Sequence, residues 1–433
     1  VLAPLPSFSE PIDPKLEHHG LHIPTFPSSW MKDKSEGPRR ACVGAMTWDG
    51  GCVPLLLEEA PERLAEDAAW VLWRPLGDKP SGLFLLPAED GATLAQTAGE
   101  LASQLTTDRP LEAFARQWYR RHPLATGRPK VALATKSIDH LRHLLDELRA
   151  TDLGVTQRRI EGPGGIASTP DPLGTKGELA FVFPGSGNHY LGMGRGVGLQ
   201  WPHILREMGT ATERLRTQML PEYFLPWRAD WRPGWEADAR KQIEDDVLRM
   251  IFGQVVHGSL MARVMAHFGL GADAAIAYSL GESAPPNAKG VWPERGEMLA
   301  RMQGLDLFTD QLAGPCLAAR RQWAVGADED FAWTVAVVPQ PQTAVDAVVE
   351  GLPRVHRLIV NTPDECVIGG LEAAVVEAVE ALGCQAFFLD GVVTVHCDAA
   401  APVADAYRQL HHFPTTAKEG LSVYSCSRAQ AYD

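Results

Sequence analysis

Short apolar runs alternate with amphipathic stretches along most of the chain, which is the pattern of a mixed α/β protein. Apolar runs at 82–86 and 131–134 predict strands, and helical spacing over 138–148 predicts a helix. Asp90 precedes another helical stretch, where its side chain can cap the first turn. We therefore expect a small α/β domain over residues 41–160.

Two stretches lack this periodicity. Residues 1–40 are rich in Pro, Ser and charged residues, which predicts an irregular N-terminal arm. Residues 161–177, EGPGGIASTPDPLGTKG, are rich in Gly and Pro and predict a linker. The linker divides the small domain from a second, larger one.

The larger domain begins with a buried strand over 179–183. A long helical segment follows over 243–268, and a second strand over 274–278 leads directly into Ser279. We expect residues 178–331 and 391–433 to form one large subdomain.

The intervening residues 332–390 have a pattern of their own. Strands and helices are predicted in the order βαββαβ, with strands at 333–338, 355–360, 365–368 and 385–389 and helices at 342–350 and 371–382. This order is the split βαβ or ferredoxin-like unit. We interpret it as a small subdomain inserted into the large one.

Composition excludes several classes of protein. Of the 433 residues, 45% are hydrophobic, which is enough to bury a large core, and the net charge of −14 argues against nucleic acid as the main partner. No apolar run is long enough to cross a membrane, and the N-terminus does not resemble a signal peptide. The seven cysteines include no C-x-x-C pair, which favours reduced thiols and a cytoplasmic protein and argues against a zinc site.

The strongest chemical signal is the segment Ala277-Tyr278-Ser279-Leu280-Gly281. A strand that runs into Ser and then a helix resembles the nucleophile elbow, usually written G-x-S-x-G. Such a turn exposes the Ser hydroxyl and directs amide N–H groups at a developing oxyanion. Short matches of this kind also arise by chance, so further residues must support the interpretation.

Two other segments add to it. Phe183-Pro184-Gly185-Ser186-Gly187 follows a strand, and a Gly-rich turn there can direct an amide N–H at an oxyanion; an ordinary turn is the alternative. His396 follows an apolar run directly after the predicted insert. A Ser nucleophile needs a base, and an imidazole with a near-neutral pKa fits, although a lone His is more often structural.

Together these segments resemble the malonyl-CoA:acyl-carrier-protein transacylase family, including the acyltransferase domains of polyketide and polyunsaturated fatty acid synthases. That family has an FPGQGSQ-type loop, a GHSxGE elbow, a ferredoxin-like insert and a late catalytic His, in this order. The variants FPGSGNHY and YSLGES are closest to iterative synthases of the polyunsaturated fatty acid and enediyne types. The domain at 41–160 then resembles the linker domain that follows a ketosynthase.

The resemblance implies an α/β-hydrolase-like large subdomain and a Ser-His dyad. Ser279 would be the nucleophile and His396 the base, with the amides of Ser186 and Leu280 as the oxyanion hole. Tyr278 stands where the family usually has His.

Malonate selection in this family uses an Arg on the helix after the elbow, because a guanidinium grips a carboxylate with two hydrogen bonds. Ungapped counting from Ser279 reaches Gly304, and Arg301 lies nearly on the same helical face. We expect Arg301 to bind the carboxylate, with Arg295 as the second choice. Val395, before the catalytic His, favours a small malonyl group, and Ser425 lies in a segment that supports that His in the family.

The sequence therefore predicts an acyltransferase that moves malonyl from malonyl-CoA to the phosphopantetheine arm of an acyl carrier protein. No metal or redox cofactor is expected, and a neighbouring ketosynthase of the same synthase is an expected partner. Two alternatives stay open. One is a serine hydrolase or thioesterase that edits acyl thioesters, and the other is a non-catalytic docking module.

Overall fold

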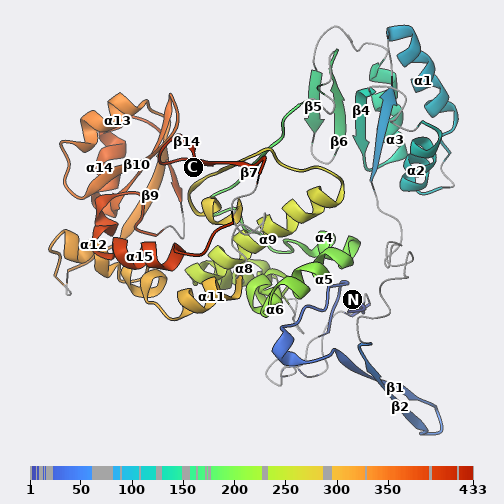
Figure 1. Ribbon diagram of the computed structural model, residues 1–433, viewed down its shortest axis with the longest axis horizontal. Helices are drawn as coiled ribbons and strands as arrows, with labels where there is room; N and C mark the ends of the chain where they lie inside the picture. The colour runs from blue at the N-terminus through green and yellow to red at the C-terminus, as the bar shows by residue number, and fades with distance from the viewer. Residues whose placement is uncertain are drawn as a thin grey trace. The chain divides into compact units, whose positions relative to one another are not determined.

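The structure is a computed structural model (Figure 1). It describes residues 2–5, 7–8, 13, 15, 23–60, 81–87, 90–106, 109–122, 129–148, 157–161, 164–170, 173, 177–226, 233–285, 295–326, 329–389, 393–416 and 419–432. The chain divides into two compact units, Trp73–Glu178 and the remainder, and each is described by itself.

In its described residues, the unit Trp73–Glu178 has a four-stranded antiparallel sheet and three helices (Figure 1). Its strands, in the sheet order β3-β4-β6-β5, are β3 Gly82–Pro87, β4 Pro129–Thr135, β6 Gly164–Ser168 and β5 Gln157–Glu161. Its helices are α1 Gly91–Ser103, α2 Leu111–Arg121 and α3 Ile138–Glu147. The predicted strands and helix are confirmed, as is the cap on α1, where Asp90 accepts from the amide of Thr93.

Alternation along β3 explains the single-sided core of this unit. Phe84 and Leu86 are fully buried while Leu83 beside them is 60% exposed. Side chains two apart on a strand share one face, so one face of the sheet packs against the helices through residues such as Trp118 and Leu141.

The prediction of a linker over 161–177 is wrong for residues 164–168. They form β6, which pairs with both β4 and β5 in the middle of the sheet. A Cβ on Gly164 would lie 2.7 Å from the carbonyl oxygen of Ala134. The glycine therefore permits close approach of two strands rather than a flexible connection.

The other unit contains a mostly parallel sheet in the order β14-β13-β8-β7. Its strands are β7 Ala180–Phe183, β8 Ala274–Ala277, β13 Ser422–Ser425 and β14 Gln430–Ala431, and β8 lies between β7 and β13, parallel to both. The 21-residue helix α9 Val247–His267 begins at Asp246, whose side chain accepts from Leu248. Buried residues occur on most sides of α9, which is the central helix of this core.

Short helices occupy the described parts of residues 195–244. They are α4 Arg195–Gln200, α5 Pro202–Ala211, α6 Leu215–Met219, α7 Pro221–Phe224 and α8 Trp235–Glu244. After the elbow come η8 Ser279–Ser283, α11 Arg295–Gln303, η9 Leu307–Gln311 and α12 Leu317–Gln322. The last helices are η10 Asp398–Val403 and α15 Ala404–His411.

The predicted βαββαβ insert is confirmed. It comprises β9 Trp333–Val338, α13 Gln342–Val349, β10 Val355–Thr362, β11 Glu365–Leu371, α14 Glu372–Leu382 and β12 Phe387–Leu389. The antiparallel sheet has the order β10-β11-β9-β12, which is the order of a split βαβ unit. Its two helices bury residues such as Val345 and Val375 against the sheet.

The described part of the N-terminal arm is irregular, as predicted, with the short helix η2 Lys34–Glu36. It is nevertheless packed, because Met31 is buried in a core cluster with α5 and α9. Asp33 accepts hydrogen bonds from both the amide and the hydroxyl of Thr217. The arm is therefore part of the larger unit.

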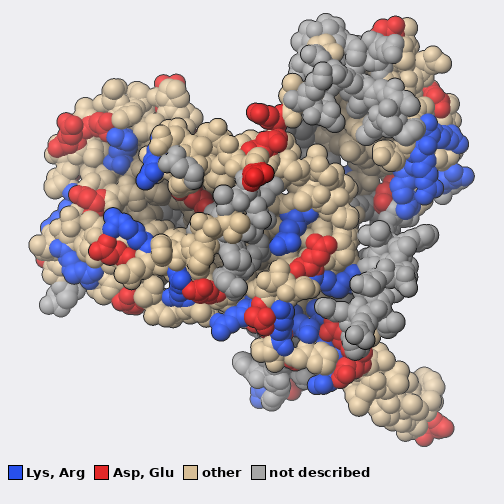
Figure 2. Space-filling view, in the orientation of Figure 1, with Lys and Arg blue, Asp and Glu red and all other residues tan. Residues whose placement is uncertain are grey.

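Strands β1 Arg40–Met46 and β2 Cys52–Glu58 form a hairpin that pairs with no other described strand. Its apolar side chains are exposed, with Met46 and Leu56 each at 80%. Figure 2 shows few charged atoms on its surface. The hairpin groups with the larger unit, so the small α/β domain does not begin at residue 41 as predicted.

Among the described residues, no helix is long and apolar enough to cross a membrane. Within the same residues, no group of three or more His, Cys, Asp or Glu side chains could hold a metal ion. All seven cysteines are unpaired.

Candidate functional site

The turn after β8 holds Ser279 in a strained conformation. Ser279 has φ of 52°, a left-handed value that is uncommon outside glycine. A 3-10 helix, η8, begins at the same residue. The strand, the strained Ser and the short helix together form the predicted nucleophile elbow.

Gly281 makes this turn possible. A Cβ there would lie 2.5 Å from the carbonyl oxygen of Phe183 and 2.6 Å from that of Pro184. The elbow is therefore packed directly against the end of β7 and the Gly-rich loop that follows it. Any larger residue at 281 would push the two segments apart.

The Gly-rich loop is held from the other side by Gln254 of α9. Its amide Nε2 donates to the carbonyl oxygens of Pro184 and Gly185. Sequence reasoning missed this residue, although a polar side chain within the apolar run of 243–268 was a usable signal. Gln254 positions the loop that carries Ser186.

His396 meets Ser279 across 117 residues of sequence. Ser279 Oγ and His396 Nε2 are 2.7 Å apart, which is a hydrogen bond. His396 also has a left-handed φ, of 65°. Thr394 anchors its segment, because the amide and the hydroxyl of that residue both donate to the carbonyl oxygen of Leu312.

The environment of His396 favours the neutral ring. Burial lowers the pKa of His396, and the negative charge of Glu282 opposes that shift in part. No described carboxylate is hydrogen-bonded to its Nδ1; the nearby Asp398 pairs with His356 instead, at 3.3 Å. A neutral imidazole can accept a proton from the Ser hydroxyl to which it is hydrogen-bonded.

Ser186 and Leu280, predicted as the oxyanion hole, both line the cleft at Ser279. Leu280 is in the first turn of η8, where amide N–H groups have no partner within the helix. Ser186 is in the turn after β7. Their placement is compatible with the predicted role.

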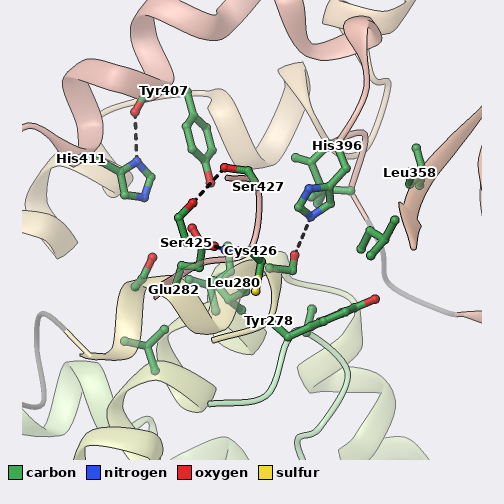
Figure 3. A pocket seen from close by; sticks show the side chains of 18 of the residues that line it. Tyr278, Leu280, Glu282, Leu358, His396, Tyr407, His411, Ser425, Cys426 and Ser427 are labelled. Carbon is green, nitrogen blue, oxygen red and sulfur yellow. Dashed lines mark hydrogen bonds between the residues drawn. The ribbon is translucent and has the colours of Figure 1, made fainter. Parts of the chain in front are cut away.

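Tyr278 links the elbow to the small subdomain. Its hydroxyl donates to Asn361 Oδ1 of β10 at 2.9 Å, and Asn361 Nδ2 donates to Glu365 Oε1 at 2.9 Å. Burial raises the pKa of Tyr278. Figure 3 shows Tyr278 extending away from Leu280 beneath His396.

Glu282, which sequence reasoning left without a role, joins the elbow to the C-terminal strands. Its carboxylate accepts from the amide of Cys426 at 2.9 Å and the hydroxyl of Tyr432 at 3.2 Å. Glu282 therefore holds β13 and β14 against the elbow and brings a negative charge to the site.

Ser425 is buried and lines the cleft, but its hydroxyl lies 3.0 Å from that of Ser427. In Figure 3 both lie on the side of Tyr407 and away from His396. No hydrogen bond joins Ser425 to His396 among the described residues. Val395 does line the cleft, next to an apolar cluster.

Arg301, predicted to bind a substrate carboxylate, is bonded elsewhere in this structure. Arg301 is absent from the described lining of the cleft. Its Nη1 donates to the carbonyl oxygens of Gln409 and His412 at 3.0 and 2.8 Å, and Glu297 accepts from its Nε. These carbonyls belong to the end of α15, where a helix leaves acceptors unpaired, so Arg301 caps that helix. The side chain of the second choice, Arg295, lies outside what the structure describes.

The cleft itself has a volume of about 2060 Å³. It runs between η8, the sheet of the small subdomain and α15, as the residues around His396 show in Figure 3. Ser279 and His396 both line this cleft, whose volume is ample for a large organic ligand.

No family model matches the chain. Curated relatives include the hybrid PKS-NRPS synthetase pytA of Aspergillus terreus, which is 25% identical over 392 residues, covering 88% of this chain and 54% of that protein. Norsolorinic acid synthase of Dothistroma septosporum is 22% identical over 428 residues, 95% of this chain and 15% of that one. A phenolphthiocerol/phthiocerol polyketide synthase of Mycobacterium tuberculosis is 24% identical over 339 residues, 77% and 20% of the two chains. This chain thus matches about half or less of each relative.

Solved structures show the fold. The acyltransferase domain from module 8 of the salinomycin polyketide synthase matches with a TM-score of 0.55 at 15% identity, covering 82% of this chain and 76% of that one. The acyltransferase domain of ZmaA gives 0.53 at 16% identity, with 82% and 74% covered. That of the iterative polyketide synthase in enediyne biosynthesis gives 0.50 at 16%, with 82% and 76%. This chain has the mixed α/β fold of such acyltransferase domains, as the sequence predicted.

Proposed function

We propose that this chain transfers an acyl group from coenzyme A to the phosphopantetheine thiol of a carrier protein, through an ester on Ser279, within a polyketide or fatty acid synthase. The observation that carries the proposal is the 2.7 Å contact between Ser279 Oγ and His396 Nε2. Both residues, Ser279 at the elbow and His396 in its distant segment, have left-handed backbone conformations. Strain of this kind persists where the surrounding structure enforces it, and it is concentrated at active sites.

In the first half-reaction, Ser279 Oγ attacks the thioester carbonyl carbon as its proton passes to His396 Nε2. The negative charge on the carbonyl oxygen is stabilised by the amides of Leu280 and Ser186. The intermediate collapses with cleavage of the carbon–sulfur bond, and the imidazolium returns the proton to the departing coenzyme A thiolate. An acyl-Ser ester remains.

In the second half-reaction, the phosphopantetheine thiol gives its proton to His396 and attacks the ester carbonyl. The ester carbon–oxygen bond breaks, and Ser279 regains its proton from the imidazolium. The carrier protein departs as the thioester. A neighbouring ketosynthase would use this product, as the resemblance implies.

The dyad also favours transfer over hydrolysis. Many serine hydrolases orient the base with a carboxylate, and the described residues place none on His396 Nδ1. A serine hydrolase nevertheless shares the first half-reaction, so an experiment must separate the two.

The test is intact mass spectrometry of the protein after mixing with acyl-coenzyme A, on the wild type and on Ser279→Ala. We expect a stable acyl adduct on the wild type alone, discharged by a phosphopantetheinylated carrier protein. Rapid release of free acid without a carrier would indicate a hydrolase. An unchanged mass with malonyl-, acetyl- and octanoyl-coenzyme A would indicate a docking module and sink the proposal.

The sequence predicted malonyl as the acyl group, on the basis of Arg301 and Val395. Because the guanidinium of Arg301 is bound to the end of α15, the acyl group has to be argued from the residues that do line the cleft.

A further inference from the structure

We infer that the acyl site at Ser279 selects a neutral, apolar acyl group over a carboxylated one such as malonyl. The inference rests on the proposed function, because it names the substrate class of the same site. It is argued from the wall beside Ser279, the charges in the cleft and the direction of the helix that follows the elbow.

The wall beside the reacting atoms is apolar. Leu280 and Val395, the neighbours of Ser279 and His396, both pack against one hydrophobic cluster. The cluster includes residues from α9, α11 and η9 that also line the cleft, among them Ile251, Phe252, Met298, Met302, Phe308 and Leu312. An acyl chain that extends from Ser279 along this wall is surrounded by carbon and sulfur atoms.

Helix α11 turns its apolar side to the cleft. Met298 and Met302, one turn apart, line the cleft, and both are more than nine-tenths buried. Arg301 instead binds the end of α15, where its guanidinium also stacks on Phe413 at 4.1 Å. The donors that could have gripped a carboxylate are thus used to cap α15.

The other cations of the described cleft are already paired. Arg357 Nε is 2.5 Å from Asp346 Oδ1, and Arg408 forms an ion pair with Asp405 within α15. His411 contacts the carbonyl oxygen of Tyr407 at 3.0 Å, and burial lowers the pKa of its ring. Among the described residues of the lining, no unpaired guanidinium or ammonium faces the cleft.

Negative charge lies close to the reacting centre instead. Glu282 is in the same short helix as Ser279, and its charge offsets part of the lowering that burial imposes on the pKa of His396. A malonyl carboxylate is two bonds from the carbonyl carbon, so it would be desolvated near this carboxylate. Two like charges in one water-poor site repel each other, and an unpaired buried charge is strongly disfavoured. Each methylene of an apolar chain, by contrast, improves binding by about fourfold.

The first experiment is a competition. The wild type is mixed with equimolar malonyl- and octanoyl-coenzyme A, quenched before loading is complete, and examined by intact mass. We expect the octanoyl adduct to exceed the malonyl adduct by about tenfold or more. A malonyl adduct equal to or larger than the octanoyl one overturns the inference and leaves acyl transfer standing. No adduct of either kind overturns the proposed function itself.

The second experiment installs a cation. Met302→Arg should raise the ratio of malonyl to octanoyl loading by about tenfold, because it adds a guanidinium to the apolar wall. Ala300→Arg adds the same charge at an exposed position of α11 and is the matched control, which should leave the ratio unchanged. If a folded Met302→Arg protein has the same malonyl-to-octanoyl ratio as the wild type, α11 does not face the acyl group and the inference is overturned.

A milder variant keeps the test decisive if an arginine at 302 prevents folding. Glu282→Gln keeps an acceptor for the amide of Cys426 but removes the charge, so malonyl loading should rise by about threefold relative to octanoyl. Glu377→Gln makes the same charge change at an exposed position of α14 and should have no effect. An unchanged ratio in Glu282→Gln contradicts the role given to its charge.

Discussion

Gly281→Ala tests whether close packing of the elbow against the end of β7 is required for acyl loading. The added Cβ would lie 2.5 Å from the carbonyl oxygen of Phe183, where real contacts are not shorter than 3.0 Å. The two backbones must therefore separate by about 0.5 Å, the difference between these distances. The loop cannot easily yield, because Gln254 holds the carbonyls of Pro184 and Gly185.

Both the folding stability and the loading rate of this variant should fall. Overpacking of this kind costs about 1–3 kcal/mol of folding free energy. A displacement near 1 Å at a catalytic centre costs about 100-fold in rate, so a shift of half that size should slow loading by about tenfold or more. The carbonyl oxygens lie next to the proposed oxyanion site. We therefore expect a marked loss of loading rate together with a moderate loss of folding free energy.

Gly258→Ala is a matched control in the same core. Its Cβ would meet Phe183 Cδ1 at 3.4 Å and Ala284 Cβ at 3.7 Å, which are ordinary contacts. Glycine within a helix such as α9 is less stable than alanine by about 0.5–1 kcal/mol, so this variant should be slightly stabilised and load normally. The measurements are quenched-flow intact mass for the loading rate and urea unfolding for stability. Wild-type rate and stability in Gly281→Ala would refute the reasoning.

The remaining predictions concern the base, the helix cap and the link to the small subdomain. Burial lowers the pKa of His396 from 6.5, and only the neutral ring accepts a proton. The loading rate should therefore fall at acid pH with a midpoint below 6.5. A rate profile with a higher midpoint would contradict this. Arg301→Ala should lower the free energy of unfolding in urea by about 1–3 kcal/mol, because main-chain carbonyls at the end of α15 lose their donor. Its loading rate should stay within about twofold of the wild type. A large loss of rate would instead indicate that Arg301 contacts the substrate. Tyr278→Phe removes the hydroxyl that donates to Asn361. It should slow loading by about threefold and lower the folding free energy by less than about 1 kcal/mol. An unchanged loading rate would show that this hydrogen bond does not position the elbow.

Local pattern predicted the inserted subdomain and several other elements of the fold correctly. The alternation of buried and exposed residues in β3 and the βαββαβ order of 332–390 were readable because strand and helix periods are short. The elbow at Ser279 was readable because a strand, a small-residue turn and a helix are contiguous in sequence. Ser279 and His396 could be paired only through a family resemblance, since 117 residues separate them.

The errors arose where distant segments decide a residue's role. Glycines at 164–165 suggested a linker, yet the close approach of Ala134 makes them part of a strand. Helical spacing placed Arg301 near the expected carboxylate-binding position. In the folded chain its guanidinium donates instead to carbonyl oxygens at the end of α15, about a hundred residues later. Gln254 and Glu282 acquired their roles in the same way, from partners far along the chain.

The sequence by itself determined the order of elements in the inserted subdomain, the elbow and the candidate reactive groups, because hydrophobic period, turn chemistry and side-chain chemistry are local properties. Only the tertiary structure decided which donors remain free and which charges face the cleft. A hydrogen-bonding group serves whichever partner the folded chain brings within about 3 Å, and that choice depends on every segment packed around it. The acyl preference inferred for this protein therefore follows from the packing of α11 and η8 rather than from the motif at Ser279.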